Sequence, residues 1–265
     1  MDTIRKNLQS AIELKNLPPA ELIKVAKNKT INSKVENLEI QIAAGKEVRL
    51  NLKNTKRLQV ELGANSNLEI VAELIAVDFQ YKIKIAKDAS LKSLIIPERS
   101  VRGEVVIDLV GNNSKARSNV ATITANKESQ EIYIKHNHIG KNTRGKITAK
   151  GIVRDEAKTN VFGLINIEEY AKKTESYEDI DIKLLSKKAT TNSLPELYID
   201  TNDVSATHTF TAGEFDEENT FYLQSRGFSQ ENTLQLMLSG FFEPILNNFK
   251  NIRRIKKSLK EKLNA

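Results

Sequence analysis

Short runs that alternate apolar and polar residues fill the middle of this chain and limit its fold more than any other feature. Between about Leu38 and Thr211 such runs follow one another, as in Leu38-Glu39-Ile40-Gln41-Ile42 and Leu58-Gln59-Val60-Glu61-Leu62. A period of two is typical of β-strands that bury one face. We therefore expect a mainly β chain.

Polar turn clusters separate these runs at a regular interval. Strands laid down in successive coils leave an apolar face that only the next coil can cover, and they repeat their turns in kind as well as in spacing. The pattern favours a β-helix over a β-sandwich, which also joins short strands by frequent turns. The earlier clusters, spaced more widely, are Gly63-Ala64-Asn65-Ser66, Ala86-Lys87-Asp88-Ala89 and Gly111-Asn112-Asn113-Ser114. The later clusters, which start 15 or 16 residues apart, are Gly140-Lys141-Asn142-Thr143, Asp155-Glu156-Ala157-Lys158, Ala171-Lys172-Lys173-Thr174, Ser186-Lys187-Lys188-Ala189 and Thr201-Asn202-Asp203-Val204.

The spacing of apolar residues changes toward both ends of the chain, which predicts three regions. Residues 1–37 are expected to form a helical lead-in, residues 38–214 the β-helix and residues 215–265 a helical domain. In the lead-in, Ile4, Leu8 and Ile12 recur every four residues and Pro18-Pro19 ends the first helix, after which Leu22, Ile23 and Val25 resume.

Three helices are expected after Gly213. Asp216 can cap the first helix, with Gly227 just beyond its end, and Ser229 can cap a second helix that reaches Gly240. Pro244 suits the first turn of a third helix. The apolar stripe of that helix, opposite its lysines, is Leu246, Phe249, Ile252, Ile255, Leu259 and Leu263.

Composition excludes several classes of function. The chain has no cysteine, so it holds no disulfide, no thiolate ligand and no cysteine nucleophile. No apolar run is long enough to span a membrane, and the first residues lack the apolar stretch of a secretory signal, so a cytoplasmic protein is expected. Of the net charge of +7, residues 249–265 carry +6, which makes broad binding to nucleic acid unsupported.

Few residues point to chemistry. Glu178, Asp179 and Asp181 could serve a carbohydrate-acting β-helix enzyme, although a charged, solvated strand edge explains them more simply. His136 and His138 lie two apart and would share one face of a strand, where they form a metal pair or, more simply, a surface or interface pair.

Several segments, taken together, resemble the SufB/SufD family of iron–sulfur cluster assembly proteins. The resemblance is strong from about Lys135 to Phe242. The segments that carry it are His136-Asn137-His138-Ile139-Gly140-Lys141-Asn142-Thr143, Lys150-Gly151-Ile152, Val161-Phe162-Gly163-Leu164-Ile165, Leu184-Leu185-Ser186, Pro195-Glu196-Leu197-Tyr198-Ile199, Thr207-His208-Thr209 and Phe221-Tyr222-Leu223-Gln224-Ser225-Arg226-Gly227.

The resemblance implies a right-handed parallel β-helix with a C-terminal helical domain. It also implies pairing through the β-helix with a SufB-like paralogue or a second copy, with a transient iron–sulfur cluster at the interface and no cofactor bound stably by this chain alone. His208 falls on the family's shared histidine position. In that family the B-type subunit supplies a cysteine and a glutamate to the interface, and the D-type subunit supplies the histidine. Here Thr209 occupies the position of the glutamate, and the cysteine position, near Asp181, has no thiol. The chain therefore resembles a D-type subunit.

The helical domain is expected to dock a SufC-type ABC ATPase. The residues expected to contact it are Phe221, Tyr222, Arg226, Gly227, Phe241 and Phe242. The sequence therefore predicts a non-catalytic scaffold subunit. A carbohydrate-acting enzyme and a protein that binds nucleic acid through the basic terminal helix are the alternatives.

Overall fold

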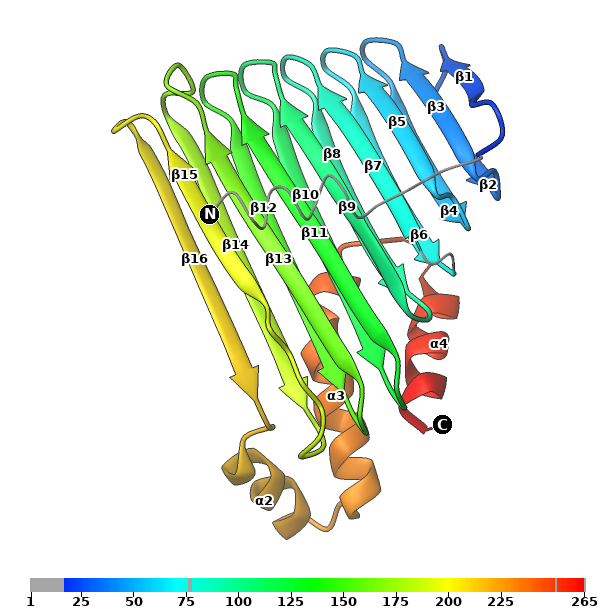
Figure 1. Cartoon of the computed structure of the whole chain (residues 1–265), viewed down its shortest axis with the longest axis vertical. Coiled ribbons are helices and arrows are strands. Elements are labelled where there is room, and N and C mark those ends of the chain that lie inside the picture. Colours follow the sequence, from blue (N-terminus) through cyan, green and yellow to red (C-terminus); the bar gives the residue numbers. More distant parts are fainter. Residues whose placement is uncertain (1–16, 76–77, 251, 265) are drawn as a thin grey trace.

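Two parallel β-sheets, stacked face to face, form most of the molecule (Figure 1). The computed structural model describes residues 17–75, 78–250 and 252–264. Each sheet has 8 strands, with the odd-numbered strands in one sheet and the even-numbered strands in the other. Because the chain changes sheet after every strand and each strand pairs in parallel with the strand one coil away, the fold is a parallel β-helix.

The strands lengthen from 5 residues in β1 and β2 to 11 in β14, whereas β15 has 6. The odd-numbered sheet comprises β1 (Glu21–Val25), β3 (Asn37–Ile42), β5 (Arg57–Leu62), β7 (Asp78–Ile85), β9 (Val101–Leu109), β11 (Ser129–His138), β13 (Lys158–Ile167) and β15 (Leu194–Ile199). The even-numbered sheet comprises β2 (Lys29–Ser33), β4 (Glu47–Lys53), β6 (Asn67–Leu74), β8 (Ser90–Pro97), β10 (Lys115–Thr124), β12 (Arg144–Val153), β14 (Thr174–Leu184) and β16 (Val204–Gly213).

The corners of the coils coincide with the polar turn clusters of the sequence. Asn65, Asp88, Asn113 and Asn142 have positive φ angles of 56°, 57°, 61° and 54°, a conformation that asparagine and aspartate tolerate better than most residues. Their side chains bond from coil to coil, since Asn113 Nδ2 donates to Asp88 Oδ1 at 2.7 Å and Asn142 Nδ2 donates to Asn113 Oδ1 at 2.6 Å. These corners confirm the predicted turns.

Each full coil contains two strands, so the 15- or 16-residue spacing of the later clusters corresponds to half a coil. Hydrogen bonds between coils show the full repeat. They join residues 19 apart at Asn51 and Asn32 and residues 32 apart at Asn192 and Asn160. The coils thus widen toward the C-terminal end.

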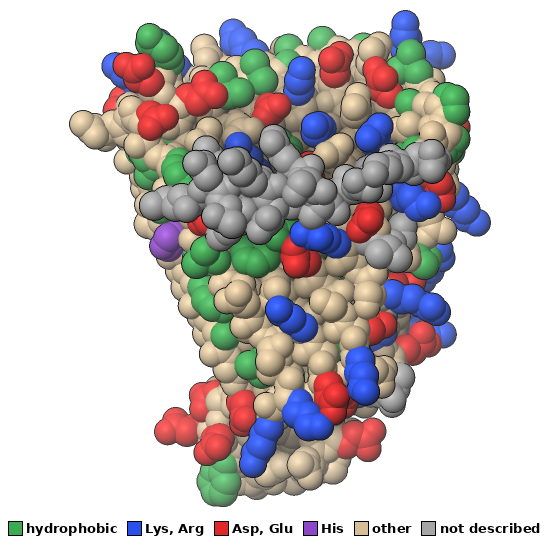
Figure 2. Space-filling view, viewed as in Figure 1, with side chains coloured by type: hydrophobic (Ala, Val, Ile, Leu, Met, Phe, Trp, Pro, Cys, Tyr) green, Lys and Arg blue, Asp and Glu red, His purple; other side chains and the backbone are tan. Residues whose placement is uncertain are grey.

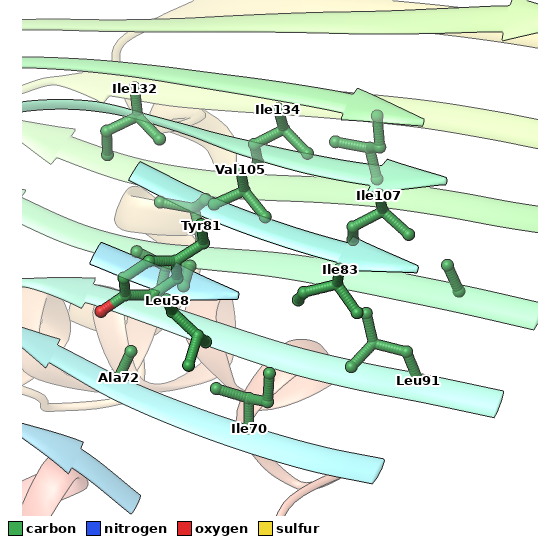
Figure 3. Packing of buried hydrophobic residues seen from close by; sticks show 14 of the residues in the cluster. Leu58, Ile70, Ala72, Tyr81, Ile83, Leu91, Val105, Ile107, Ile132 and Ile134 are labelled. Atoms are coloured by element: carbon green, nitrogen blue, oxygen red, sulfur yellow. The ribbon is translucent and has the colours of Figure 1, made fainter. Parts of the chain in front are cut away.

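The inward residues of both sheets form one continuous apolar core (Figure 3). Strand β5 shows the pattern, because Leu58, Val60 and Leu62 are buried while the residues between them face outward. Tyr81 also points inward, and its hydroxyl donates to the Thr55 carbonyl oxygen at 2.8 Å. The alternation seen in the sequence is therefore the alternation between core and solvent.

Three helices follow the solenoid, and two of them cover the outer face of the even-numbered sheet (Figure 1). They are α2 (Glu217–Ser225), α3 (Gln230–Leu246) and α4 (Arg253–Asn264). Outward side chains of the sheet form a second core with α3 and α4. The predicted boundary near residue 215 thus marks a change of secondary structure, and the helices share a core with the sheet. The sheet residues of this second core are Val71, Leu94, Ile96, Ala121, Ile123 and Ile152.

Two sequence predictions need correction. Residues 21–33, expected to be helical, form β1 and β2, so the β-helix begins earlier than residue 38. The first predicted helix, with Ile4, Leu8 and Ile12, lies outside the described residues. Pro244 lies within α3, which continues to Leu246 instead of ending at Gly240, and the last helix starts at Arg253.

The caps at Asp216 and Ser229 are as predicted, since their side chains accept hydrogen bonds from the backbone of Glu218 and Asn232. The predicted apolar stripe is also buried where the structure describes its side chains. Within residues 17–75, 78–250 and 252–264, no helix is both long and apolar enough to cross a membrane.

Candidate functional site

The C-terminal end of the solenoid is open, and His208 lies there. Strand β16 is the last strand of its sheet and pairs with β14 on one side only, which leaves its other edge unpaired among the described residues. His208 is exposed on this strand, opposite Glu178 of β14. Thr209 lies beside it, opposite Asp179.

The register also fixes the face on which His208 lies. Partners in a parallel pair share one face of the sheet, and Glu178 points into the solenoid with 2% of its surface exposed. His208 is therefore on the inward face of the last strand, where no further coil covers it. A side chain in this position is available to a partner that closes the end of the solenoid.

Glu178 spans the interior from the even-numbered sheet to Gly163 of β13. A Cβ atom on residue 163 would lie 1.4 Å from Glu178 Oε1, so only glycine fits there. Neither carboxyl oxygen has a hydrogen-bond partner in the described part of the chain. Burial, together with the nearby Glu196, raises the pKa of Glu178 to about 8.

The three acidic residues of β14 differ from the expected solvated edge. Glu178 is a core residue, so the prediction of a solvated strand edge is wrong for this residue. Asp179 is half-buried, and Asp181 forms ion pairs with Lys150 at 3.5 Å and Lys183 at 3.2 Å. The signal for Glu178 was in the alternation of its strand, because Ser176 and Ile180 on either side also point inward.

His136 and His138 lie inside the solenoid, so the expected surface pair is wrong. The ring centroids of His136 and His138 are 6.3 Å apart. His136 Nε2 is 2.8 Å from Ser118 Oγ. His138 Nδ1 lies 2.8 Å from Thr143 Oγ1, and its Nε2 lies 3.0 Å from Ser176 Oγ. Hydroxyl groups therefore occupy both nitrogens of His138.

Burial keeps both imidazoles neutral. It lowers the pKa of His136 to about 3, with a further contribution from His138, and the pKa of His138 to about 4. Among the described residues, no group of three or more histidines and carboxylates is arranged to hold a metal ion. The described residues thus supply His208 with no companion ligands for a metal ion.

The predicted docking residues fall into two sets. Phe221 and Tyr222 of α2 are 73% and 55% exposed, and the Arg226 guanidinium lies 5.2 Å from the centre of the Tyr222 ring. Gly227 follows with φ +90°, as a helix end requires.

The other set, Phe241 and Phe242, is buried in the second core, where the Lys150 ammonium lies 4.4 Å from the centre of the Phe241 ring. We therefore restrict the docking prediction to the α2 residues.

Comparison with known proteins supports the sequence resemblance. Residues 27–241 match the family model for the SufBD core domain of the SUF system for FeS cluster assembly. The chain is 29% identical to the iron–sulfur cluster assembly protein SufD of Bacillus subtilis over 156 residues, which cover 59% of this chain and 36% of that protein.

Two further relatives cover a similar share. An iron–sulfur cluster assembly SufBD family protein of Synechocystis is 32% identical over 139 residues, or 52% of this chain and 29% of that protein. A chloroplastic SufBD family protein of Arabidopsis thaliana is 27% identical over 139 residues, which are 52% of this chain and 25% of the relative. The matches thus span between a quarter and about a third of the length of these three relatives.

Proposed function

We propose that this chain, which belongs to the SufBD core family of the SUF system for iron–sulfur cluster assembly, is a non-catalytic D-type scaffold subunit. It pairs end to end with a SufB-like chain and supplies His208 to a site that both chains share. The observation that carries the proposal is the place of His208, on the inward face of an uncovered terminal strand.

The open end has the chemistry of an interface. Strands β15 and β16 are the edge strands of the two sheets at the same end of the solenoid, and unpaired edges accept strands from another chain. Exposed apolar side chains accompany these edges, with Leu194 44%, Ile199 40% and Phe210 39% exposed. A second solenoid that covers this end would bury them and would surround His208.

The missing thiolates explain why a partner is needed. Iron–sulfur clusters are held mainly by cysteine thiolates, and this chain has no cysteine. A single imidazole is a weak site by itself, but it can complete a ligand set provided by another chain. The cluster is cargo of the assembly in this proposal, and the chain alone holds none stably.

Helix α2 suits the second predicted partner, a SufC-type ATPase. It has no buried residue, and it projects Phe221 and Tyr222 away from the two cores. Exposed aromatic side chains beside an arginine are common at the centres of protein interfaces.

The enzyme alternative receives less support from the geometry. Acid–base hydrolysis needs two carboxyl groups that reach a substrate, but Glu178 is enclosed and Asp181 is neutralised by two lysines. The basic terminal helix also has a structural use, because its apolar side covers the even-numbered sheet.

Co-purification with a cysteine-bearing SufB-type chain from the same organism tests the pairing. Phe210→Asp places a charge at the open end and should abolish co-purification. Leu22→Asp is the matched control, because Leu22 is 49% exposed on β1 at the opposite end of the solenoid, and it should leave the pair intact. Pairing that survives Phe210→Asp, or that fails equally in both variants, would contradict an interface at the open end.

A further inference from the structure

A groove of about 680 Å³ crosses the outer face of the even-numbered sheet, on the part that α3 and α4 leave uncovered. It runs along the solenoid axis over the first residues of β2, β4, β6, β8 and β10. Lys250, which follows α3, borders it as well. The groove is thus built by many coils and belongs neither to the open end nor to α2.

Basic side chains dominate the lining of the groove. The acidic residues are Glu47 and Glu69. Glu69 is already neutralised, because it forms ion pairs with Arg49 at 2.7 Å and with Lys92 at 2.8 Å. The basic residues are Lys29, Arg49, Lys92, Lys115, Arg117 and Lys250.

The remaining cations have no carboxylate partner in the described part of the chain. Lys29, Lys115, Arg117 and Lys250 are exposed, and Glu47 is the one acidic side chain of the lining left to offset them. The register continues the basic column beyond the groove, since Arg117 pairs with Lys92 on one side and with Lys146 on the other. Neighbouring strands lie about 4.8 Å apart, so these like charges are held close together.

This arrangement differs from the opposite face of the molecule. Figure 2 shows the side away from α3 and α4, where Lys and Arg are interspersed with Asp and Glu. Interspersed positive and negative side chains are typical of a sheet face that is exposed to solvent. A concave surface with an excess of one sign of charge instead concentrates counter-charged ligands.

We propose that this groove binds an acidic, extended peptide segment of a partner protein. From β2 to β10 it spans about 19 Å, the length of about six extended residues. Ser90 Oγ donates to Asn67 Oδ1 within the lining, and the side-chain NH2 group of Asn67 can donate to a peptide backbone. The proposal goes beyond the assembly function, since it concerns a different face and a different partner.

Single-stranded nucleic acid fits the groove less well. Proteins that bind it without sequence preference interleave aromatic side chains with their basic residues, so that bases stack on the rings. Among the residues that the structure describes, no aromatic side chain lines this groove. The carboxylate of Glu47 would also oppose a continuous phosphate backbone, whereas an acidic peptide can place an uncharged residue beside it.

Fluorescence anisotropy with a labelled peptide of about 12 residues that alternates Glu and Ser tests the proposal on the full chain. The double variant Lys115→Glu/Arg117→Glu should weaken peptide binding by about tenfold or more. The matched control Lys82→Glu/Lys84→Glu reverses two exposed charges on β7 of the opposite sheet and should change it less than about twofold. If the first variant loses its β-type circular dichroism, Lys115→Gln/Arg117→Gln takes its place.

A labelled oligothymidylate of about 12 nucleotides distinguishes the two ligand classes. The wild-type chain should bind the peptide more tightly than the oligonucleotide at the same salt concentration. Tighter binding of the oligonucleotide, equal losses in both double variants, or no peptide binding at low salt would each overturn the proposal.

Discussion

The first and the last coils of the solenoid differ in what fills their interiors. In the early coils the inward strand residues are mostly aliphatic, as in Leu38, Leu50 and Ile70. In the late coils the interior also holds polar side chains. Among these are Ser118, Thr122, Thr124, Gln130, His136, His138, Thr143, Thr159, Thr174, Ser176 and Glu178.

The early coils mainly stabilise the fold, whereas the late coils also hold side chains that can form hydrogen bonds or titrate. Aliphatic burial stabilises a coil by about 25 cal/mol for each Å² removed from water, whereas a buried polar group costs free energy unless it is hydrogen-bonded. Most of the late polar groups are bonded to one another, but Glu178 and His136 Nδ1 have no partner in the described residues. The coils that depart from simple core packing are those next to the open end and His208.

The largest effect is expected in the aliphatic interior. Ile70→Ala removes a fully buried side chain and should lower the free energy of unfolding by about 3 kcal/mol. Ser118→Ala, in the polar interior, should lower it by about 1 kcal/mol, because it removes one hydrogen bond to His136. Denaturant titrations followed by circular dichroism measure both, and equal losses would remove the distinction between the two regions.

Gly163→Ala should lower the free energy of unfolding by about 2 kcal/mol, because the added Cβ overlaps Glu178. The double variant Gly163→Ala/Glu178→Ala should recover most of this loss, since the alanine side chain leaves room. A double-mutant cycle measures the coupling between the two positions. Additive effects would show that the carboxyl group of Glu178 does not lie against Gly163.

Glu178 should make the protein less stable as the pH rises. Its pKa is raised from 4.5 to about 8 in the folded chain, so its stabilising contribution is complete below pH 4.5 and is lost as the pH rises toward 8. The slope is roughly 1.4 kcal/mol per pH unit within that window. Glu178→Gln, which does not titrate, should lack this part of the pH dependence in denaturant titrations, and an unchanged profile would contradict the burial of a protonated carboxyl.

The buried histidines should act in the opposite direction at acidic pH. Their folded pKa values of about 3 and 4 lie below the usual 6.5, so the unfolded chain takes up protons first and stability falls as the pH drops below about 6.5. His136→Gln should remove about half of this acid-induced loss. The same titrations at pH values from about 6.5 to 4.5 measure it, and a slope equal to that of the wild type would place His136 in contact with solvent.

Much of the fold could be predicted because alternation and turn chemistry are local. The corners at Asn113 and Asn142 follow from the turn residues, and the caps of α2 and α3 follow from Asp216 and Ser229. Strand β1 was missed because its residues Leu22 and Ile23 do not alternate. These residues form a strand because they pair with β3, and a local sequence pattern does not reveal a pairing with a distant segment.

The site was predicted less completely, for physical reasons. A carboxylate is rarely buried without a partner, so the composition of β14 suggested a solvated edge, although Glu178 lies in phase with the inward residues of its strand. Similarly, Phe241 and Phe242 have the composition of an interface, and only the packing of α3 against the sheet shows that they are core residues. The position of His208 at an open end depends on where the coils stop.

The central claim is that His208 serves a site shared with another chain. It is measured most directly as the iron and sulfide bound, with the accompanying visible absorbance, after anaerobic reconstitution of the complex with a cysteine-bearing SufB-type partner. We predict no stable chromophore for this chain alone, a chromophore for the complex, and a marked loss in the complex of the His208→Ala variant. That variant should unfold at the same denaturant concentration as the wild type, because the ring is exposed. Thr207→Ala, at the adjacent exposed position, should have no effect, and a His208→Ala complex that binds as much iron and sulfide as the wild type would contradict the claim.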